Sequence, residues 1–325
     1  MIWRFFAGKG VQYALVLLFA ATANFALPRM MPGSPLVFLA GEDVGFMTEA
    51  QRTQLYQAFG LDQPIYRQYA IYLANLAQGN LGHSFQQGRP VAEIILARLG
   101  WTVLLVGGAL LLATVIGIAW GTLAAWRRGR PFDIGSLAGA MLLESTPSFW
   151  LAMIFIAVLA AGARWFPVFG AMTPGAGLRG TAHILDVAWH LVLPMATLTL
   201  ITVPTLFLIM RASLLSVLGE QFITSARAKG LTERGVMFRH AMRNALLPVA
   251  TVFMLNLGYI VSGATVIETV FSYPGIGRLL FEAVLARDYP VLQGAFFIVT
   301  VSVIMANIAA DLIYPLLDPR VRHAR

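Results

Sequence analysis

"SARAKGLTERGVMFRHAMRNALLP", from Ser225 to Pro248, is a basic stretch that lies between two long apolar segments. Its cations are five lysines and arginines, with one histidine that is charged only when protonated: Arg227, Lys229, Arg234, Arg239, Arg243 and His240. The chain from Glu220 permits a helix as far as Gly230, which fits a C-terminal cap position. Thr232 offers an N-cap for a second helix. We therefore predict a short helix, a glycine turn and a second helix at a membrane surface.

The composition places the chain in a lipid bilayer. Some 58% of the residues are hydrophobic and only 12% are charged, which is far less charge than a soluble domain carries. The formal charge of +8 lies in loops between apolar spans, so the positive-inside rule explains it better than nucleic acid does. The absence of cysteine excludes disulfides, thiolate metal sites and cysteine nucleophiles. The apolar run 11–27 is long for a cleaved signal peptide.

A membrane-spanning helix needs about 20 mostly apolar residues. Six segments qualify: 10–28, 101–125, 134–161, 191–211, 246–267 and 291–316. With the N-terminus inside, fourteen of the 23 lysines and arginines lie on inside segments, and five of the other nine lie on the long segment 29–100. We therefore predict an all-α integral membrane protein with six transmembrane helices and both termini in the cytoplasm.

The predicted organisation has three parts. Residues 1–100 hold the first transmembrane helix and a periplasmic helical segment, residues 101–316 the other five helices, and residues 317–325 a basic cytoplasmic tail. In the outer segment, Thr48 and Gln51 are expected to form a capping box at the start of a helix that ends at Gly60. Pro64 opens a further helix that Gly79 closes.

The basic loop has two interpretations on residue chemistry alone. Ala226, Ala228 and Gly230 allow another surface to approach closely, while Arg227 and Lys229 can pair with acidic groups on it. The alternative is a basic loop that rests on anionic lipid. Composition favours neither.

The loop resembles the cytoplasmic "EAA" loop of binding-protein-dependent ABC importer permeases, in the dipeptide, oligopeptide and nickel branch. Thr224, Ser225 and Ala226 occupy the Glu-Ala-Ala triplet, Gly230 its glycine, and Leu247-Pro248 the closing Leu-Pro. Thr224 replaces the usual Glu, but "ARAKGL" is the form that this branch resembles. Further segments are similar in the expected order: 60–85, 145–153, 271–294 and 311–322.

The resemblance implies a type I ABC importer permease fold with a coupling helix near 220–230. The expected coupling residues are Glu220, Thr224, Ser225, Ala226, Arg227, Lys229 and Gly230. Expected partners are a related second permease, two cytoplasmic ABC ATPases that bind ATP and Mg²⁺, a periplasmic solute-binding protein and membrane lipid. The sequence has no GxxxxGK[ST] loop, so the chain itself is not expected to be an enzyme or to hold a cofactor.

Ionisable groups within spans are candidates for function, because each costs about 2.5–3.5 kcal/mol at the bilayer centre. Glu144 lies about 15 Å into the third span and precedes Pro147, which removes a helix hydrogen bond. A translocation path is expected to include Glu144, Ser145, Pro147 and Asn256. The alternative is that the Glu144 carboxyl is paired with a neighbouring subunit, or is neutral and hydrogen-bonded in the interior.

The segment 268–290 carries too many charges to span a bilayer. The resemblance implies an outer gate and a seat for the binding protein, with Tyr273, Pro274, Gly275, Arg278, Arg287 and Asp288 as candidates. The five histidines show no ligand spacing, so no metal site is predicted.

The expected function is uptake of di- and oligopeptides across a bacterial inner membrane. A nickel or metal-chelate importer of the same branch is the alternative. An ion-coupled carrier is less favoured, because such carriers show repeated halves and several intramembrane acids, and neither is found here.

Overall fold

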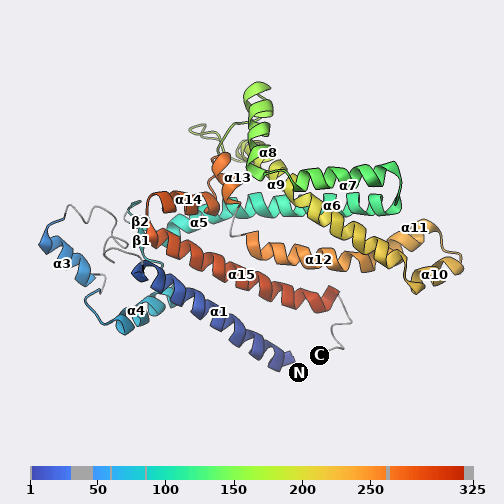
Figure 1. Cartoon of the computed structure of the whole chain (residues 1–325). Coiled ribbons are helices and arrows are strands. Elements are labelled where there is room, and N and C mark those ends of the chain that lie inside the picture. The colour runs from blue at the N-terminus through green and yellow to red at the C-terminus, as the bar shows by residue number, and fades with distance from the viewer. Residues whose placement is uncertain (1, 31–46, 59–60, 85, 261–263, 318–325) are drawn as a thin grey trace. The chain divides into compact units, whose positions relative to one another are not determined.

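The computed structural model describes residues 2–30, 47–58, 61–84, 86–260 and 264–317. The predicted stop at Gly60 and nearly all of the basic tail 317–325 lie outside these ranges. The chain divides into two compact units (Figure 1). Unit 1 comprises residues 1–101 with 275–304, and unit 2 comprises 102–274 with 305–325.

Unit 1 holds the first helix, the outer segment and the start of the last helix. Its elements are α1 (Ile2–Met30), α3 (Glu49–Ala58), α4 (Ile65–Ala77), β1 (His83–Ser84), β2 (Arg89–Pro90), α5 (Val91–Thr102), α14 (Ile276–Leu285) and the first part of α15 (Tyr289–Leu317). The two short strands pair antiparallel. The core joins α5, α14 and α15 through Val91, Ile95, Leu279 and Ala295.

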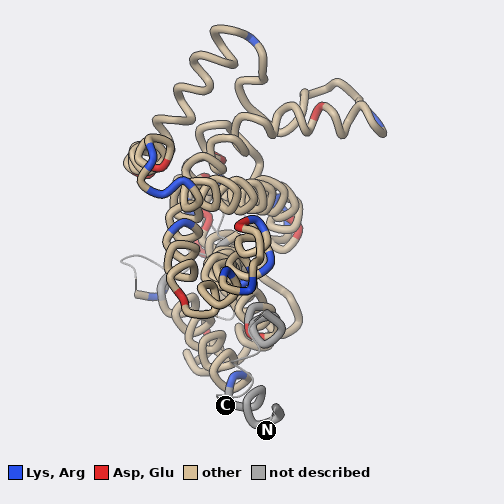
Figure 2. The backbone as a smooth tube through the Cα atoms, turned by 90° about the vertical axis from the view of Figure 1, so that its right-hand side faces the viewer, with Lys and Arg blue, Asp and Glu red and all other residues tan. Residues whose placement is uncertain are grey.

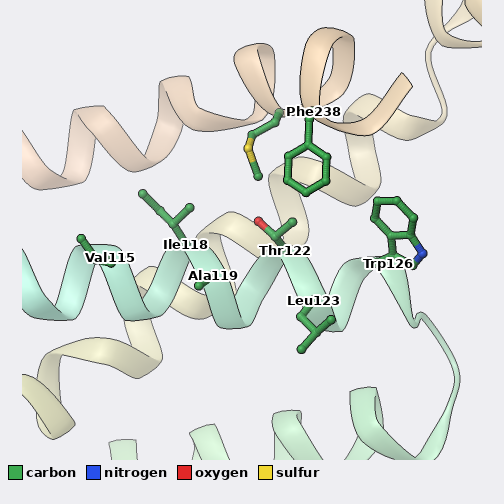
Figure 3. A pocket seen from close by; sticks show the side chains of 8 residues that line it. Val115, Ile118, Ala119, Thr122, Leu123, Trp126 and Phe238 are labelled. Carbon is green, nitrogen blue, oxygen red and sulfur yellow. The ribbon is translucent and has the colours of Figure 1, made fainter. Parts of the chain in front are cut away.

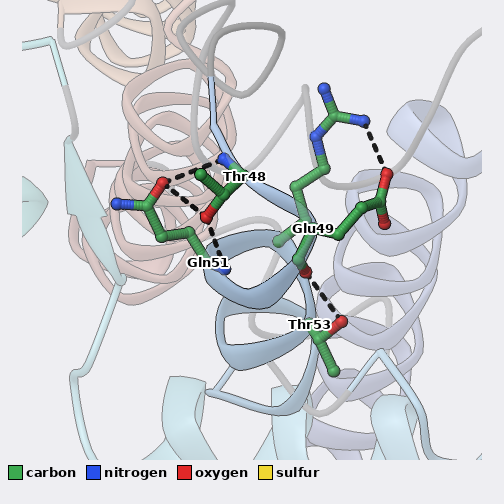
Figure 4. Close-up of polar contacts among 5 residues, drawn as sticks. Thr48, Glu49, Gln51 and Thr53 are labelled. Carbon is green, nitrogen blue, oxygen red and sulfur yellow. Dashed lines mark hydrogen bonds and ion pairs between the residues drawn. The ribbon is translucent and has the colours of Figure 1, made fainter.

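The predicted capping box is confirmed at the start of α3 (Figure 4). Gln51 Oε1 accepts a hydrogen bond from the Thr48 backbone N–H over 2.9 Å, and Thr48 Oγ1 accepts one from the Gln51 N–H over 3.4 Å. The α4 helix begins after Pro64 and is followed by Gly79 at φ +74°, as predicted. Tyr69 of α4 packs edge-on against Phe25 of α1, with ring centroids 5.1 Å apart.

Unit 2 is built around two long helices. Its elements are η2 (Val103–Gly107), α6 (Gly108–Trp126), α7 (Pro131–Glu144), α8 (Ser148–Phe155), η3 (Ile156–Gly162), α9 (Thr181–Leu218), α10 (Gln221–Ala228), α11 (Glu233–Gly235), η4 (Val236–Ala241), α12 (Met242–Tyr259), α13 (Thr265–Val270) and the rest of α15. In Figure 1, α6 and α7 run beside each other, and α9 crosses them.

Two glycines let α6 approach α9. A Cβ at Gly117 would lie 2.7 Å from Leu206 Cβ, and one at Gly121 would lie 2.7 Å from the Phe207 carbonyl oxygen. The spacing is the small-xxx-small pattern of membrane helix contacts. Leu206 and Phe207 are fully buried beneath these glycines.

Among the described residues, three helices are long and apolar enough to cross a membrane: Val91–Trp126, Thr181–Leu218 and Tyr289–Ala309. A bent pair, Pro131–Glu144 with Ser148–Gly162, makes a fourth candidate. The first of these is continuous through α5, η2 and α6, so it begins ten residues before the predicted span. The chain is therefore a largely helical, multi-pass membrane protein.

Two predicted spans differ in shape from continuous helices. The third bends by 96° at the break between Glu144 and Ser148, a larger effect than the kink expected from Pro147 alone. In the fifth, α12 ends at Tyr259 and α13 starts at Thr265, and Pro248 lies inside α12.

Polar side chains within the helices of unit 2 find partners inside the chain. Thr197, Thr202 and Asn256 donate to carbonyls four residues earlier in their own helices. Glu268 is fully buried in unit 2, where Thr102 Oγ1 donates to its Oε1 over 2.9 Å.

Candidate functional site

The predicted helix, turn and helix are present in the basic loop of unit 2. The long helix α9 ends at Leu218, and α10 begins at Gln221 with Glu220 in an extended N-cap conformation. Gly230 has φ +79°, which glycine adopts without the penalty that a Cβ imposes. Thr232 Oγ1 accepts a hydrogen bond from the Gly235 N–H over 3.3 Å, as an N-cap does.

One face of α10 is anchored in the core of unit 2. Ile223 is fully buried and Ala226 is 6% exposed, in one cluster with Leu214 of α9 and Val236 of η4. Ala226 was expected to admit a partner, but its side chain packs within this chain. The small side chain of Ala226 therefore lets α10 pack closely against the rest of unit 2. Burial of this face fixes the direction in which the opposite face points.

The opposite face of α10 is exposed. It carries Phe222, Thr224, Ser225, Arg227 and Ala228. Phe222 is 41% exposed and adds an apolar ring to this otherwise polar face. Sequence reasoning missed Phe222. The signal was available, because Phe222 lies one position before Ile223 and so cannot share its buried face.

Arg227 already has an acidic partner within the chain. Its Nε donates to Glu233 Oε1 over 2.9 Å, and its Nη2 donates to Glu233 Oε2 over 3.2 Å. This bidentate pair connects α10 to α11 across the Gly230 turn. Lys229 lies beside the turn and is exposed. Figure 2 looks onto this end of unit 2, where lysines and arginines gather.

Glu144 lies at the break between α7 and α8, as its position before Pro147 predicts. Its side chain is exposed in the single chain, and Pro147 takes an extended conformation as the N-cap of α8. Ser145 Oγ donates to the Met141 carbonyl over 2.9 Å. Asn256 of α12 donates to the Val252 carbonyl over 3.0 Å within its own helix.

The expected outer residues divide into buried and exposed sets. Tyr273, Gly275 and Asp288 are buried, Pro274 and Arg278 are half-buried, and Arg287 is exposed. In unit 1, Asp288 accepts a hydrogen bond from Ser84 Oγ and another from the Val291 N–H at the start of α15. Because both of these hydrogen bonds are made within the chain, buried Asp288 supports the fold.

Tyr273 is also buried. Burial raises the pKa of its hydroxyl, and nearby Glu268 adds to the effect.

Residues 117–323 match the family of inner membrane components of binding-protein-dependent transport systems. The chain belongs to this family. The matched range contains α10, the Gly230 turn, the α7–α8 break and the outer segment after α13. The family resemblance drawn from the basic loop is thus confirmed.

Individual members of the family are similar to this chain over nearly its whole length. The di/tripeptide transport system permease protein DppB of Pseudomonas aeruginosa is 38% identical over 316 residues, covering 93% of this chain and 94% of that protein. The oligopeptide transport system permease protein AppB of Bacillus subtilis is 36% identical over 309 residues, covering 95% and 96%. The dipeptide transport system permease protein DppB of Escherichia coli K12 is 38% identical over 319 residues, covering 93% and 94%.

Proposed function

We propose that the chain is the membrane permease subunit of an ATP-driven importer of di- and oligopeptides in a bacterial inner membrane. The relatives above are named as permeases for dipeptides, tripeptides and oligopeptides. Their names favour peptides over the nickel or metal-chelate alternative. In this proposal six transmembrane helices cross the membrane, and both termini lie in the cytoplasm.

The observation that carries the proposal is the seating of α10. Its inner face is locked into unit 2 through Ile223 and Ala226, and its outer face is exposed. Only two residues separate α10 from the end of α9, which is a candidate membrane span. A push on the outer face of α10 is therefore delivered to a long helix and its packed core, because interiors are dense and transmit strain.

The proposed source of that push is a pair of cytoplasmic ATPases that bind ATP and Mg²⁺. In such a contact Phe222 supplies an apolar anchor, and Arg227 and Lys229 supply charges for acidic groups. A second, related permease completes the pore. A periplasmic binding protein delivers the peptide at the opposite surface, where Arg287 is exposed. The transport step is alternating access by rigid-body movement.

We propose that the α7–α8 break is a polar part of the translocation path. Broken membrane helices are tolerated where they line a cavity, and transporters place their substrate sites at such breaks. Glu144 is exposed there in the single chain and carries a negative charge. We assign to it the recognition of a cationic group, such as the amino terminus of a peptide.

The test is ATP-driven peptide uptake in proteoliposomes that contain the intact transporter. Ala228 lies on the exposed face of α10, so Ala228→Trp adds bulk there without disturbing the core. We expect this variant to lose uptake and to lose its ATPases on purification. Ala70→Trp, at an exposed position of α4, is the matched control and is expected to keep both. Normal uptake by Ala228→Trp would contradict the proposal.

A further inference from the structure

An apolar groove runs along α6 in unit 2, with η4 and the start of α12 as its other wall (Figure 3). Its volume is about 570 Å³. Val115, Ala119 and Leu123 line it from α6, and Phe238 and Met242 line it from the facing wall. Trp126 closes the end next to the 127–130 loop, and its ring centroid lies 6.2 Å from that of Phe238.

One polar group faces this groove. Thr122 is 7% exposed, and its hydroxyl has no hydrogen-bond partner in the described part of the chain. Figure 3 shows the oxygen directed from α6 toward the wall that carries Phe238. Thr114, two turns earlier on the same helix, satisfies its hydroxyl by donating to the Leu110 carbonyl over 2.7 Å. Thr122 makes no such bond among the described residues, and its hydroxyl oxygen is itself buried.

Four arginines are next to lining residues of the groove, or nearly so, in the sequence. Arg127 and Arg128 directly follow Trp126, and Arg239 and Arg243 directly follow the lining residues Phe238 and Met242. All four arginines are exposed. Within the residues that the structure describes, none of them forms an ion pair. The groove therefore combines a long apolar floor with an aromatic pair at one end, and exposed arginines lie close in sequence to that pair.

We propose that this groove binds one anionic phospholipid from the leaflet at the α10 end of the protein. The phosphate lies among the four arginines, which are suited to its oxygens. One acyl chain follows α6 toward Val115.

The dimensions of the groove agree with a lipid in one leaflet. From Val115 to Trp126 the helix rises about 16 Å, which is roughly half of the 30 Å hydrocarbon thickness. Tryptophan is enriched at the boundary between the hydrocarbon and the headgroups, where the proposal places Trp126. A free phosphate would use the arginines but would leave the apolar floor uncovered. Charge and length together therefore favour a phospholipid.

The first experiment counts retained lipid by mass spectrometry. The chain is purified, with the subunits that accompany it, from nanodiscs of equal phosphatidylglycerol and phosphatidylcholine. Ala119 is an exposed lining residue, so Ala119→Trp fills the groove, and Ile116→Trp on an exposed position outside the lining is the control. We expect Ala119→Trp to retain at least tenfold less phosphatidylglycerol than Ile116→Trp. Equal retention by the two variants would overturn the proposal.

The second experiment tests the role of the arginines. We expect the wild type to prefer phosphatidylglycerol, and Arg239→Gln combined with Arg243→Gln to reduce that preference several-fold. Arg234→Gln, which removes an exposed cation that does not adjoin a lining residue in the sequence, is expected to keep the preference. Equal retention of both lipids by the wild type would contradict an anionic occupant.

A third experiment distinguishes a lipid from a protein in the groove. The chain has no cysteine, so Ala119→Cys places a single thiol in the groove. Reaction of that thiol with a membrane-soluble maleimide, without a cross-link to another subunit, supports the lipid. A high-yield cross-link to another subunit would show that protein covers the groove and would overturn the proposal. These outcomes do not depend on which substrate is transported.

Discussion

Arg211 binds the carboxylate of Asp133 through two hydrogen bonds, from Nε to Oδ1 over 2.6 Å and from Nη2 to Oδ2 over 2.8 Å. Asp133 lies in the first turn of α7 and is 2% exposed, and the Gly129 N–H donates to the same carboxylate. Arg211 lies seven residues before the end of α9. The pair therefore ties the broken helix that carries Glu144 to the helix that leads into α10.

Removing this pair is expected to destabilise unit 2 strongly. Asp133→Asn leaves the Arg211 guanidinium without its counter-charge, and breaking a buried pair in this way costs about 3–5 kcal/mol. Unfolding by heat or denaturant in detergent measures the loss of stability. Glu93→Gln removes an exposed pair with Arg89, 3.5 Å apart, and is expected to cost less than about 1 kcal/mol. Equal losses in the two variants would show that the Asp133 pair adds no specific stability.

The contact between α6 and α9 is expected to have no room for a methyl group at Gly121. Gly121→Ala would place a Cβ 2.7 Å from a backbone oxygen of α9, which cannot move away as a flexible side chain can. We expect a loss of about 1–3 kcal/mol in the free energy of unfolding. Gly139→Ala is the matched control, because nothing lies within 4 Å of its Cβ and alanine is the better helix former. An unchanged stability for Gly121→Ala would contradict the close packing.

Several features of the fold were predictable because they depend on local chemistry. Thr48, Thr232 and Gly230 act through caps and a left-handed turn, which a few neighbouring residues determine. The long apolar helices were likewise visible as runs of hydrophobic residues. The family followed from motifs in their order along the chain.

Other features depend on contacts between distant residues and were not predictable. Asp133 and Arg211 are 78 positions apart, and neither lies in a motif that indicates its partner. The buried position of Glu268 depends on Thr102, which lies 166 positions away. The third predicted span bends by 96° at Pro147, whose extended conformation ends one helix and begins the next, whereas a proline in the sequence predicts only a kink.

The pair between Arg227 and Glu233 is expected to compete with an ATPase for Arg227. The pair is 44% and 65% exposed, so Glu233→Gln should change the free energy of unfolding by less than about 1 kcal/mol. We expect it to strengthen ATPase binding a few-fold, because Arg227 is then free to bind acidic groups of the partner. Binding of purified ATPase to the permease in detergent measures this effect.

A matched control is Glu49→Gln, which removes an exposed acid paired with Arg52 on α3. It is expected to leave ATPase affinity unchanged. Weaker binding in Glu233→Gln would mean that the intact pair forms part of the docking surface, contrary to this account.

Glu144 is expected to discriminate between cationic and neutral peptides. Glu144→Gln keeps the size of the side chain and removes its charge, so uptake of a peptide with a free amino terminus should fall about tenfold. Uptake of the same peptide after N-acetylation should change little. Leu142→Ala, at an exposed position of α7 two residues earlier, is the control for local disturbance. Equal effects on both peptides would remove Glu144 from substrate recognition.

The central claim is that α10 sits against an ATPase through the face that this chain leaves exposed. The most direct measurement is cross-linking of single cysteines to an ATPase during ATP-driven transport. Each variant then carries one thiol, because the native chain has no cysteine. We predict cross-links from Thr224→Cys and Ala228→Cys on the exposed face, and none from Ile223→Cys, whose side chain is fully buried. Peptide uptake that continues while no position on the exposed face of α10 cross-links to an ATPase would contradict the account.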